Sequence, residues 1–133
     1  MSALTEALCA AQAELPTAIP RDSQGYGYRY TSLDKLIELT RPILTKHGIT
    51  ISQEPGFVQV ADGLRPILTT RLECGDDRAG FSTPLYVKDQ NMQGLGAAIT
   101  YARRYAWAAV LGIASEEDTD DAGLAPNDED VPF

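Results

Sequence analysis

The middle of the chain constrains the fold most, because short apolar stretches alternate there with residues that favour tight turns. Extended segments are expected at residues 49–53, 57–60, 67–74 and 81–87. Asp and Gly are adjacent within residues 61–63 and 75–77, which predicts turns between these segments. Strands joined by such short turns pair antiparallel, because parallel strands need long crossover connections. The sequence therefore predicts an antiparallel meander of three or four strands.

A long helix is expected to follow the meander, from about residue 92 to residue 113. Apolar residues recur there at three- and four-residue steps and form a stripe that should pack on the sheet: Leu95, Ile99, Ala102, Ala106, Ala109, Val110 and Ile113. The opposite face carries polar or small residues, namely Gln93, Ala97, Thr100, Arg104 and, at its border, Arg103. Gly94 and Gly96 near the start should allow a close approach of the backbone.

Two shorter helices are expected before the meander. Apolar residues spaced by three or four predict the first over residues 3–15, where Pro16 ends it. Ser32 is a good N-terminal cap for the second, which should run to Gly48 with a kink or break near Pro42. The chain is thus assigned to the α+β class, with an antiparallel three- or four-stranded meander packed on a long C-terminal helix and two N-terminal helices.

Acidic residues are concentrated at the end of the chain, and they divide the sequence into two parts. The 133 residues include 11 basic and 19 acidic ones, a net charge of −8, and eight of the acids follow residue 115, where no Lys or Arg occurs. Residues 1–115 therefore hold 11 acidic and 11 basic residues and are predicted to form one neutral domain. Residues 116–133 are predicted to be a disordered acidic tail. The overall charge thus does not exclude a nucleic-acid partner.

Other classes of protein are disfavoured by what the sequence lacks. No apolar run is long enough to span a membrane, and the N-terminus lacks the basic start of a secretory signal. Cys9 and Cys74 have no CxxC spacing, which favours idle thiols in a reducing cytoplasm over a disulfide. His47, the single histidine, is expected to face solvent at a helix end, so neither a zinc site nor a catalytic base is predicted. No P-loop motif occurs, and no cofactor is expected.

The segment Tyr-Gly-Tyr-Arg-Tyr at residues 26–30 has the composition of a nucleic-acid contact. It is expected to be extended, and it interleaves aromatic rings with a cation. Such a pattern can stack bases and contact phosphates. The alternative is that one or two of these tyrosines close the edge of the core.

Arg103 and Arg104 form a second candidate contact. They lie on the long helix, whose outward face also offers Thr100 and Gln93 as hydrogen-bonding groups. A guanidinium suits phosphate because its planar fork can donate two hydrogen bonds at once. The alternative is a structural ion pair, with Glu73 or with the acids of the tail.

The same helix carries a family signature. The segment QGLGAAITYARRYA at residues 93–106, with Leu-Gly-Ile at 111–113 and an acidic run at 116–118, resembles the signature of the Erf family. These are the "essential recombination function" single-strand annealing proteins of phages. Residues 28–33, 41–44 and 47–49 resemble the upstream block of that family. The resemblance spans residues 3–121 and departs at Gly96, where the family often has Ser, and in the short acidic C-terminal part.

This resemblance implies a fold like that of the eukaryotic Rad-type annealing proteins, in which a small antiparallel sheet packs on a long helix and copies assemble into rings or filaments. It implies a protein that binds single-stranded DNA and anneals complementary strands without ATP, in phage or prophage recombination in the bacterial cytoplasm. No catalytic residue, metal or cofactor is expected. The expected DNA contacts are Arg103, Arg104, Thr100 and Gln93, followed by Tyr28, Arg29 and Lys35.

The last six residues carry a separate resemblance. They are similar to the acidic, Ile-Pro-Phe-ending tip of bacterial single-strand DNA-binding proteins, which docks into partner pockets, and they read Asp128, Glu129, Asp130, Val131, Pro132 and Phe133. Phe133 would be the apolar anchor, and its terminal carboxylate would pair with a base. The expected partner is a host replication or repair protein. Two alternatives stay open, a merely solubilising tail and a tail that folds back on the arginines and competes with DNA.

Two other functions compete with annealing. A single-strand coating protein of the OB type would protect strands and block their pairing, but its barrel needs more strands than this sequence predicts. It would also leave the helix at residues 100–105 without a role. An interaction adaptor would use the tail as its functional part and the domain as a scaffold.

Overall fold

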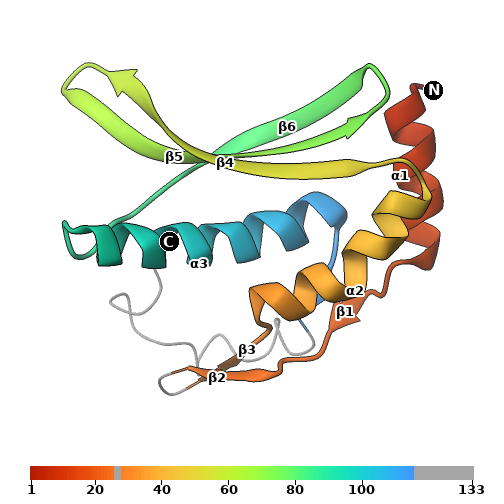
Figure 1. Ribbon diagram of the computed structural model, residues 1–133, viewed down its shortest axis with the longest axis horizontal. Coiled ribbons are helices and arrows are strands. Elements are labelled where there is room, and N and C mark those ends of the chain that lie inside the picture. The colour runs from red at the N-terminus through yellow and green to blue at the C-terminus, as the bar shows by residue number, and fades with distance from the viewer. Residues whose placement is uncertain (26–27, 116–133) are drawn as a thin grey trace.

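The computed structural model describes residues 1–25 and 28–115, and it has an α+β architecture (Figure 1). Its elements in chain order are α1 (Ala3–Glu14), β1 (Ala18–Ile19), β2 (Ser23–Gly25), β3 (Tyr28–Tyr30), α2 (Leu33–Lys46), β4 (Thr50–Val60), β5 (Gly63–Cys74), β6 (Asp77–Pro84), α3 (Met92–Leu111) and β7 (Ala114–Ser115). The predicted α+β class is confirmed, and the meander has three strands rather than four. The tail at 116–133 lies outside the described residues, so the predicted division of the chain at residue 115 stays a prediction.

The meander consists of β4, β5 and β6, with β5 in the centre. β4 is one continuous strand, whereas two separate stretches were expected there. Pro55 pairs with Leu68 without interrupting the ladder, because an edge strand tolerates a proline whose missing donor faces away from its neighbour. β6 starts at Asp77 rather than at the predicted residue 81, since Gly75 takes a φ of 61° that lets the chain turn at once.

α3 runs across one face of this sheet (Figure 1). β5 presents Leu68, Thr70 and Leu72 on that face, and all three side chains are buried. α3 meets them with small residues, which let the helix lie close to the strands: Ala98, Ala102 and Ala106. The opposite face of the sheet, which carries the alternate residues of each strand, is left uncovered by α3.

The second half of α3 packs on α2 as well as on the sheet. Trp107 and Leu111 are buried there, and the indole N–H of Trp107 donates a 2.9 Å hydrogen bond to Oγ1 of Thr40. Ala109, which was expected in the apolar stripe, is exposed, so that part of the prediction is wrong. The buried stripe shifts around the helix axis in this half, because α3 packs there on α2 as well as on the sheet. It is confirmed for Leu95, Ile99, Ala102, Ala106, Val110 and Ile113, which are buried or pack on the core.

α2 is one helix that continues through Pro42, so the expected break near Arg41 is wrong, while the other expected outcome, a kink there, stays a prediction. Pro42 cannot bond to the carbonyl of Glu38, but both residues are exposed and that carbonyl can be solvated. The buried side chains of Leu36, Thr40 and Leu44 anchor the helix to the core on both sides of the proline.

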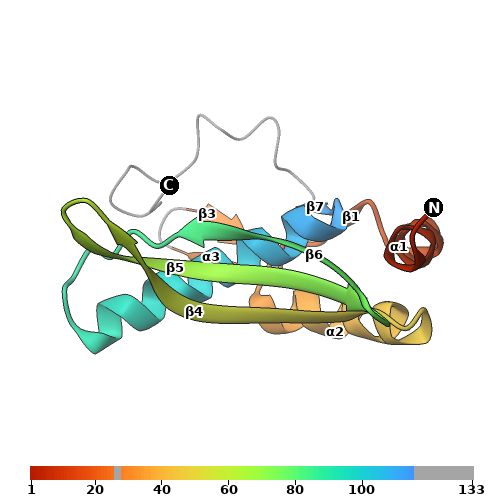
Figure 2. The same cartoon turned by 90° about the horizontal axis from the view of Figure 1, so that it is seen from above.

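Two small sheets complete the domain. β2 and β3 form an antiparallel hairpin, and β1 pairs in parallel with β7, with Ala18 opposite Ala114. Figure 2 shows β1 and β7 side by side at the C-terminal end of α3. Neither β1 nor β7 was predicted, because a two-residue strand has no periodicity to detect. Within the described ranges, no helix is long and apolar enough to cross a membrane.

Candidate nucleic-acid interface

The start of α3 is set by a cap and by one glycine. Asn91 accepts a 2.7 Å hydrogen bond from the backbone N–H of Gly94. A Cβ atom on Gly94 would lie 1.9 Å from the carbonyl oxygen of Asp89, so only glycine fits there. Gly96 has open space around it, so the expected close approach is confirmed for Gly94 and wrong for Gly96. These constraints fix which residues of α3 face away from the sheet.

The guanidinium of Arg104 lies among three tyrosine rings. Its Cζ is 4.5 Å from the ring centroid of Tyr30 on β3, 4.7 Å from that of Tyr101 and 5.5 Å from that of Tyr105. Tyr101 and Tyr105 are one helical turn apart and stack with centroids 5.1 Å apart and an interplanar angle of 29°. We call Tyr30, Tyr101, Arg104 and Tyr105 the tyrosine–arginine cluster.

Arg104 has no carboxylate partner among residues 1–25 and 28–115. The alternative of an ion pair with Glu73 is therefore not formed. The acids of the tail lie outside the described residues. The π faces of the rings hold the cation without cancelling its charge, since they contribute only a quadrupole. Arg104 is half-buried yet still a net positive group.

Arg103 is held differently, by the sheet. Its Nε donates a 3.2 Å hydrogen bond to Oε1 of Gln53 on β4, and Nε2 of Gln53 donates back to the carbonyl of Arg103 at 3.1 Å. The same amide nitrogen lies 3.1 Å from Oγ1 of Thr70, a fully buried residue. Arg103 therefore turns toward β4 and not toward the tyrosines. Its two Nη groups have no hydrogen-bond or ion-pair partner among the described residues.

The remaining predicted contacts on α3 lie on its outward face. Gln93 and Thr100 are exposed, as is Ala97 between them. A helix advances about 100° per residue, so these positions and Arg104 form one row on the side away from the sheet, while Arg103 falls outside it. The structure thus brings Gln93, Thr100 and Arg104 to one face and separates Arg103 from them.

The predicted contacts outside α3 lie around the start of α2. Lys35 is in the first turn of that helix, and its N–H donates to Oγ of the capping Ser32. Ser32 in turn donates from its N–H and its hydroxyl to Asp22, at 2.8 Å each. The backbone hydrogen bond from Ser32 is the main cause that lowers the pKa of Asp22, and the charge of Lys35 contributes to the same shift. Tyr28 and Arg29 form β3, but their side chains lie outside the described residues, as do residues 128–133 of the docking tip.

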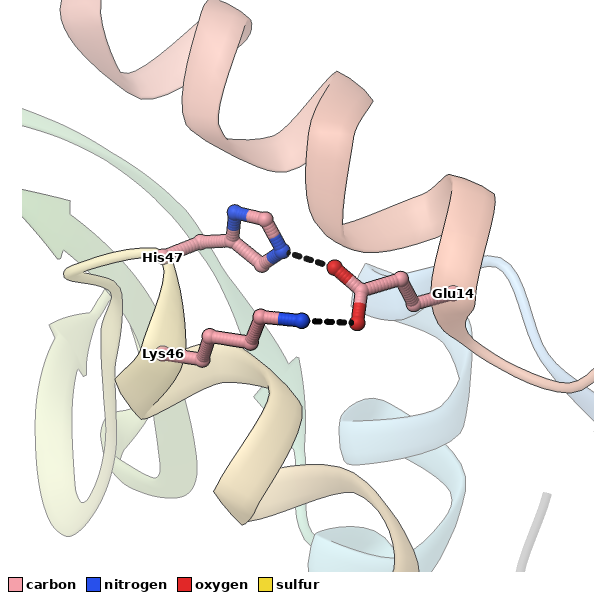
Figure 3. Close-up of polar contacts among 3 residues, drawn as sticks. All are labelled: Glu14, Lys46 and His47. Carbon is pink, nitrogen blue, oxygen red and sulfur yellow. Dashed lines mark hydrogen bonds and ion pairs between the residues drawn. The ribbon is translucent and has the colours of Figure 1, made fainter.

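A separate ionic cluster joins the ends of α1 and α2 (Figure 3). The carboxylate of Glu14 contacts Nζ of Lys46 at 2.8 Å and the Nε2 atom of His47. Hydrogen bonds from Lys46 and then from His47 lower the pKa of Glu14. The His47 side chain is only 20% exposed, so the expectation that it faces solvent is wrong. The sequence did not reveal the contact of His47 with the carboxylate of Glu14, because Glu14 lies 33 positions earlier, on α1.

Metal-binding groups are not assembled in the ranges 1–25 and 28–115. No group of three or more His, Cys, Asp or Glu residues there could hold a metal ion. Cys9 and Cys74 are free thiols, the first exposed and the second half-buried.

Three residues of the site were not selected from the sequence. Tyr101 and Tyr105 were treated as part of the family signature and not as contacts, although Tyr101 lies three residues before Arg104 and four before Tyr105, spacings at which side chains meet on a helix. Gln53 gave no such sign, because its contact with Arg103 joins residues 50 positions apart.

The fold and this surface define a class: small α+β proteins that present a helix with arginine and aromatic side chains, the groups by which proteins hold unpaired nucleic-acid strands. A family model described as the ERF superfamily matches residues 4–131, and the chain belongs to this family. The resemblance to Erf proteins found in the sequence is thereby confirmed, and membership points to recombination by single-strand annealing. No curated protein and no solved structure matches the chain.

Proposed function

We propose that this protein binds single-stranded DNA and anneals complementary strands without a nucleotide cofactor, in phage or prophage homologous recombination in the bacterial cytoplasm. The observation that carries the proposal is the ERF superfamily match over nearly the whole chain. The outward row of α3 supports it with Gln93, Thr100 and Arg104, and Arg103 adds Nη groups beside β4 that have no partner within the described ranges. Lys35, Tyr28 and Arg29 are proposed as further contacts on the neighbouring elements.

Annealing requires a strand to be held while its base edges stay free. Contacts to phosphates carry no sequence information, so binding should be independent of sequence. It should weaken by about 0.7 log units per log unit of salt for each phosphate neutralised on a single strand. One neutral domain makes few such contacts. We therefore propose a homo-oligomer, a ring or filament of the Rad-type kind, in which neighbouring copies repeat the row of α3 and bind the strand with avidity.

The acidic tail has a proposed role of its own. Residues 128–133 would dock into an apolar pocket with a basic rim on a host replication or repair protein, with Phe133 as the anchor. Deletion of residues 131–133 should abolish this docking and leave DNA affinity unchanged. If removal of residues 116–133 instead tightens DNA binding, the tail competes with DNA, and docking is not its main role.

The proposal is tested by mixing two complementary labelled oligonucleotides, without ATP, and following duplex formation by energy transfer. The annealing protein should accelerate pairing. Slower pairing would show a coating protein, and unchanged pairing an adaptor, and either result would contradict the proposal. Arg104→Ala should lose the acceleration. Arg78→Ala is the matched control, because Arg78 is exposed on β6 and its alternate position places it on the face of the sheet that α3 leaves uncovered.

A further inference from the structure

The three-stranded sheet has two edges, and one of them is blocked. β4 and β6 are the outer strands (Figure 2). Among the backbone positions of β4 that point away from β5, Pro55 has no N–H to donate, and Glu54 beside it adds a charge. A proline and a charge in the middle of an edge strand are common means of preventing a further strand from pairing there. The sheet is therefore not readily extended beyond β4.

β6 forms the other edge, and its middle carries no such block. The N–H of Leu85 donates to the carbonyl of Pro66 on β5 at 3.0 Å, which fixes the backbone orientation along the strand. Every second residue before Leu85 also faces β5, so the backbone groups of Arg78, Gly80 and Ser82 point outward. In the described part of the chain, these outward groups make no backbone hydrogen bond. An open edge of this kind is a template for a strand of another chain.

The side chains along this edge suit a second copy of the same strand. Phe81 is 40% exposed, and it lies on the face of the sheet that α3 covers, since it pairs with the buried Thr70. Antiparallel pairing of two β6 strands about a two-fold axis at Phe81 would place the two Phe81 rings opposite each other, in a non-hydrogen-bonded pair where side chains come closest. Arg78 would lie opposite Pro84 of the second copy. This register joins two aromatic rings and opposes no like charges.

A shallow hollow on the uncovered face of the sheet lies along the same edge. Its volume is about 330 Å³, and its lining includes Arg78, Gly80 and Ser82. A Cβ atom on Gly80 would lie 2.4 Å from the carbonyl oxygen of Thr70, so this position must remain glycine and the floor of the hollow stays open. In the register centred on Phe81, Ser82 of the second copy would lie beside Gly80. The hollow therefore leaves room for the side chains of a paired copy.

We infer that the edge of β6 is an interface between two copies of this chain, which pair antiparallel around a two-fold axis at Phe81. This inference rests on the homo-oligomer in the proposed function and names one of its interfaces. A two-fold axis perpendicular to the sheet keeps its faces, so α3 of both copies would lie on one side of a continuous sheet. Both outward rows would then face the same side, which favours binding of strands with avidity. Because β4 is blocked, the sheet closes after two copies.

The first test places opposite charges at the two-fold axis. Light scattering after size-exclusion chromatography of the full-length protein without DNA should give an even number of chains. Phe81→Lys and Phe81→Glu should each weaken association by about tenfold or more, because each removes the paired rings and opposes two like charges. A mixture of the two variants should associate again, since the charges that meet are then opposite. Thermal melting by circular dichroism checks that each variant is folded.

The second test addresses the backbone pairing. Ser82→Pro removes an outward N–H and leaves the ladder with β5 intact. Association should weaken by about tenfold, because each copy loses one hydrogen bond. Gln59→Pro is the matched control, since it removes an outward N–H from the blocked edge on β4, and it should leave association unchanged.

The outcomes separate this interface from the proposed function. Unchanged association of the Phe81 variants overturns the interface, and so does a mixture of them that fails to recover. An odd number of chains in the wild-type assembly also overturns it, because two-fold pairing leaves no copy single. If the wild-type protein is a monomer, the interface and the proposed homo-oligomer both fail. The annealing assay is independent of these results, and strand annealing itself fails only if oligonucleotide pairing is not accelerated.

Discussion

The two sides of α3 hold neighbouring arginines in opposite ways. On the β4 side, Arg103 exchanges hydrogen bonds with Gln53, which fix its side chain against the sheet. On the β3 side, Arg104 is held by the faces of tyrosines and has no carboxylate partner within the described ranges. One residue step, about 100° on a helix, places them on different surfaces. Two arginines that are adjacent in the sequence therefore lie on different surfaces, and they do not form a single phosphate-binding site.

The largest effect, on stability, is expected in the core that supports both sides of α3. Trp107 is 1% exposed and fixes the second half of α3 to α2 through Thr40. Trp107→Ala should lower the free energy of unfolding by about 3–5 kcal/mol, because it leaves a cavity and removes the hydrogen bond that the indole donates to Thr40. Urea denaturation followed by far-UV circular dichroism measures this. Phe57→Ala, at an exposed aromatic, should change stability by less than about 0.5 kcal/mol; similar losses in the two variants would contradict the packing described for α3.

The next effect separates the two arginines directly. Arg104→Ala should weaken oligo(dT) binding by about tenfold, since it removes the cation of the cluster. Arg104→Lys should recover only part of this loss, because an ammonium keeps the charge but is not planar. Fluorescence anisotropy at fixed salt measures the affinities. Arg103→Ala should have the smaller effect of the two arginine variants, and a larger one would reverse the comparison between the two sides of α3.

A smaller effect is expected on the β4 side. Gln53→Ala removes the hydrogen bonds to Arg103 and takes a donor from the buried hydroxyl of Thr70. The free energy of unfolding should fall by about 1 kcal/mol. DNA affinity should stay near the wild-type value, because the tyrosine side is not touched. A loss of affinity as large as that of Arg104→Ala would show that the β4 side is also part of the strand contact.

The smallest effect is expected far from both sides, at Glu14. The lowered pKa of Glu14 means that its contacts with Lys46 and His47 stabilise the fold above its ordinary pKa, and that this stabilisation is lost as the pH falls through the lowered value. Glu14→Gln should therefore be slightly less stable than the wild type at pH 7 and equally stable near pH 2, about where both side chains are neutral. Unfolding curves across this range test the sign. Unchanged DNA binding at pH 7 would show that slight destabilisation alone does not mimic Arg104→Ala.

Local patterns were sufficient to predict much of the fold. The turns at 61–63 and 75–77, the cap at Ser32 and the apolar spacing in α3 depend on neighbouring residues, and the elements built from them are present. The break expected at Pro42 and the burial expected for Ala109 were wrong, because both depend on what the helix packs against. The helix continues at Pro42 because solvent can bond the unpaired carbonyl, and Ala109 is exposed where Trp107 is buried and bonded to Thr40 of α2.

The candidate site was predictable only in part, for the same reason. The row formed by Gln93, Thr100 and Arg104 follows from helical geometry alone. The ring of Tyr30 above Arg104 requires the β2–β3 hairpin to return to α3, and the hold of Gln53 on Arg103 requires the register of the sheet against the helix. Neither arrangement leaves a periodic trace in the sequence.

The parallel pairing of β1 with β7 bears on how the protein is made in the cell. Ribosomes release a chain from its N-terminus, and Ala18 is synthesised long before its partner Ala114. The N–H of Ala114 also donates to the carbonyl of Thr17, which emerges equally early. During synthesis β1 therefore has no strand partner until translation has passed Ser115. A transcript truncated before that codon would encode a product that lacks β7, so β1 would stay unpaired.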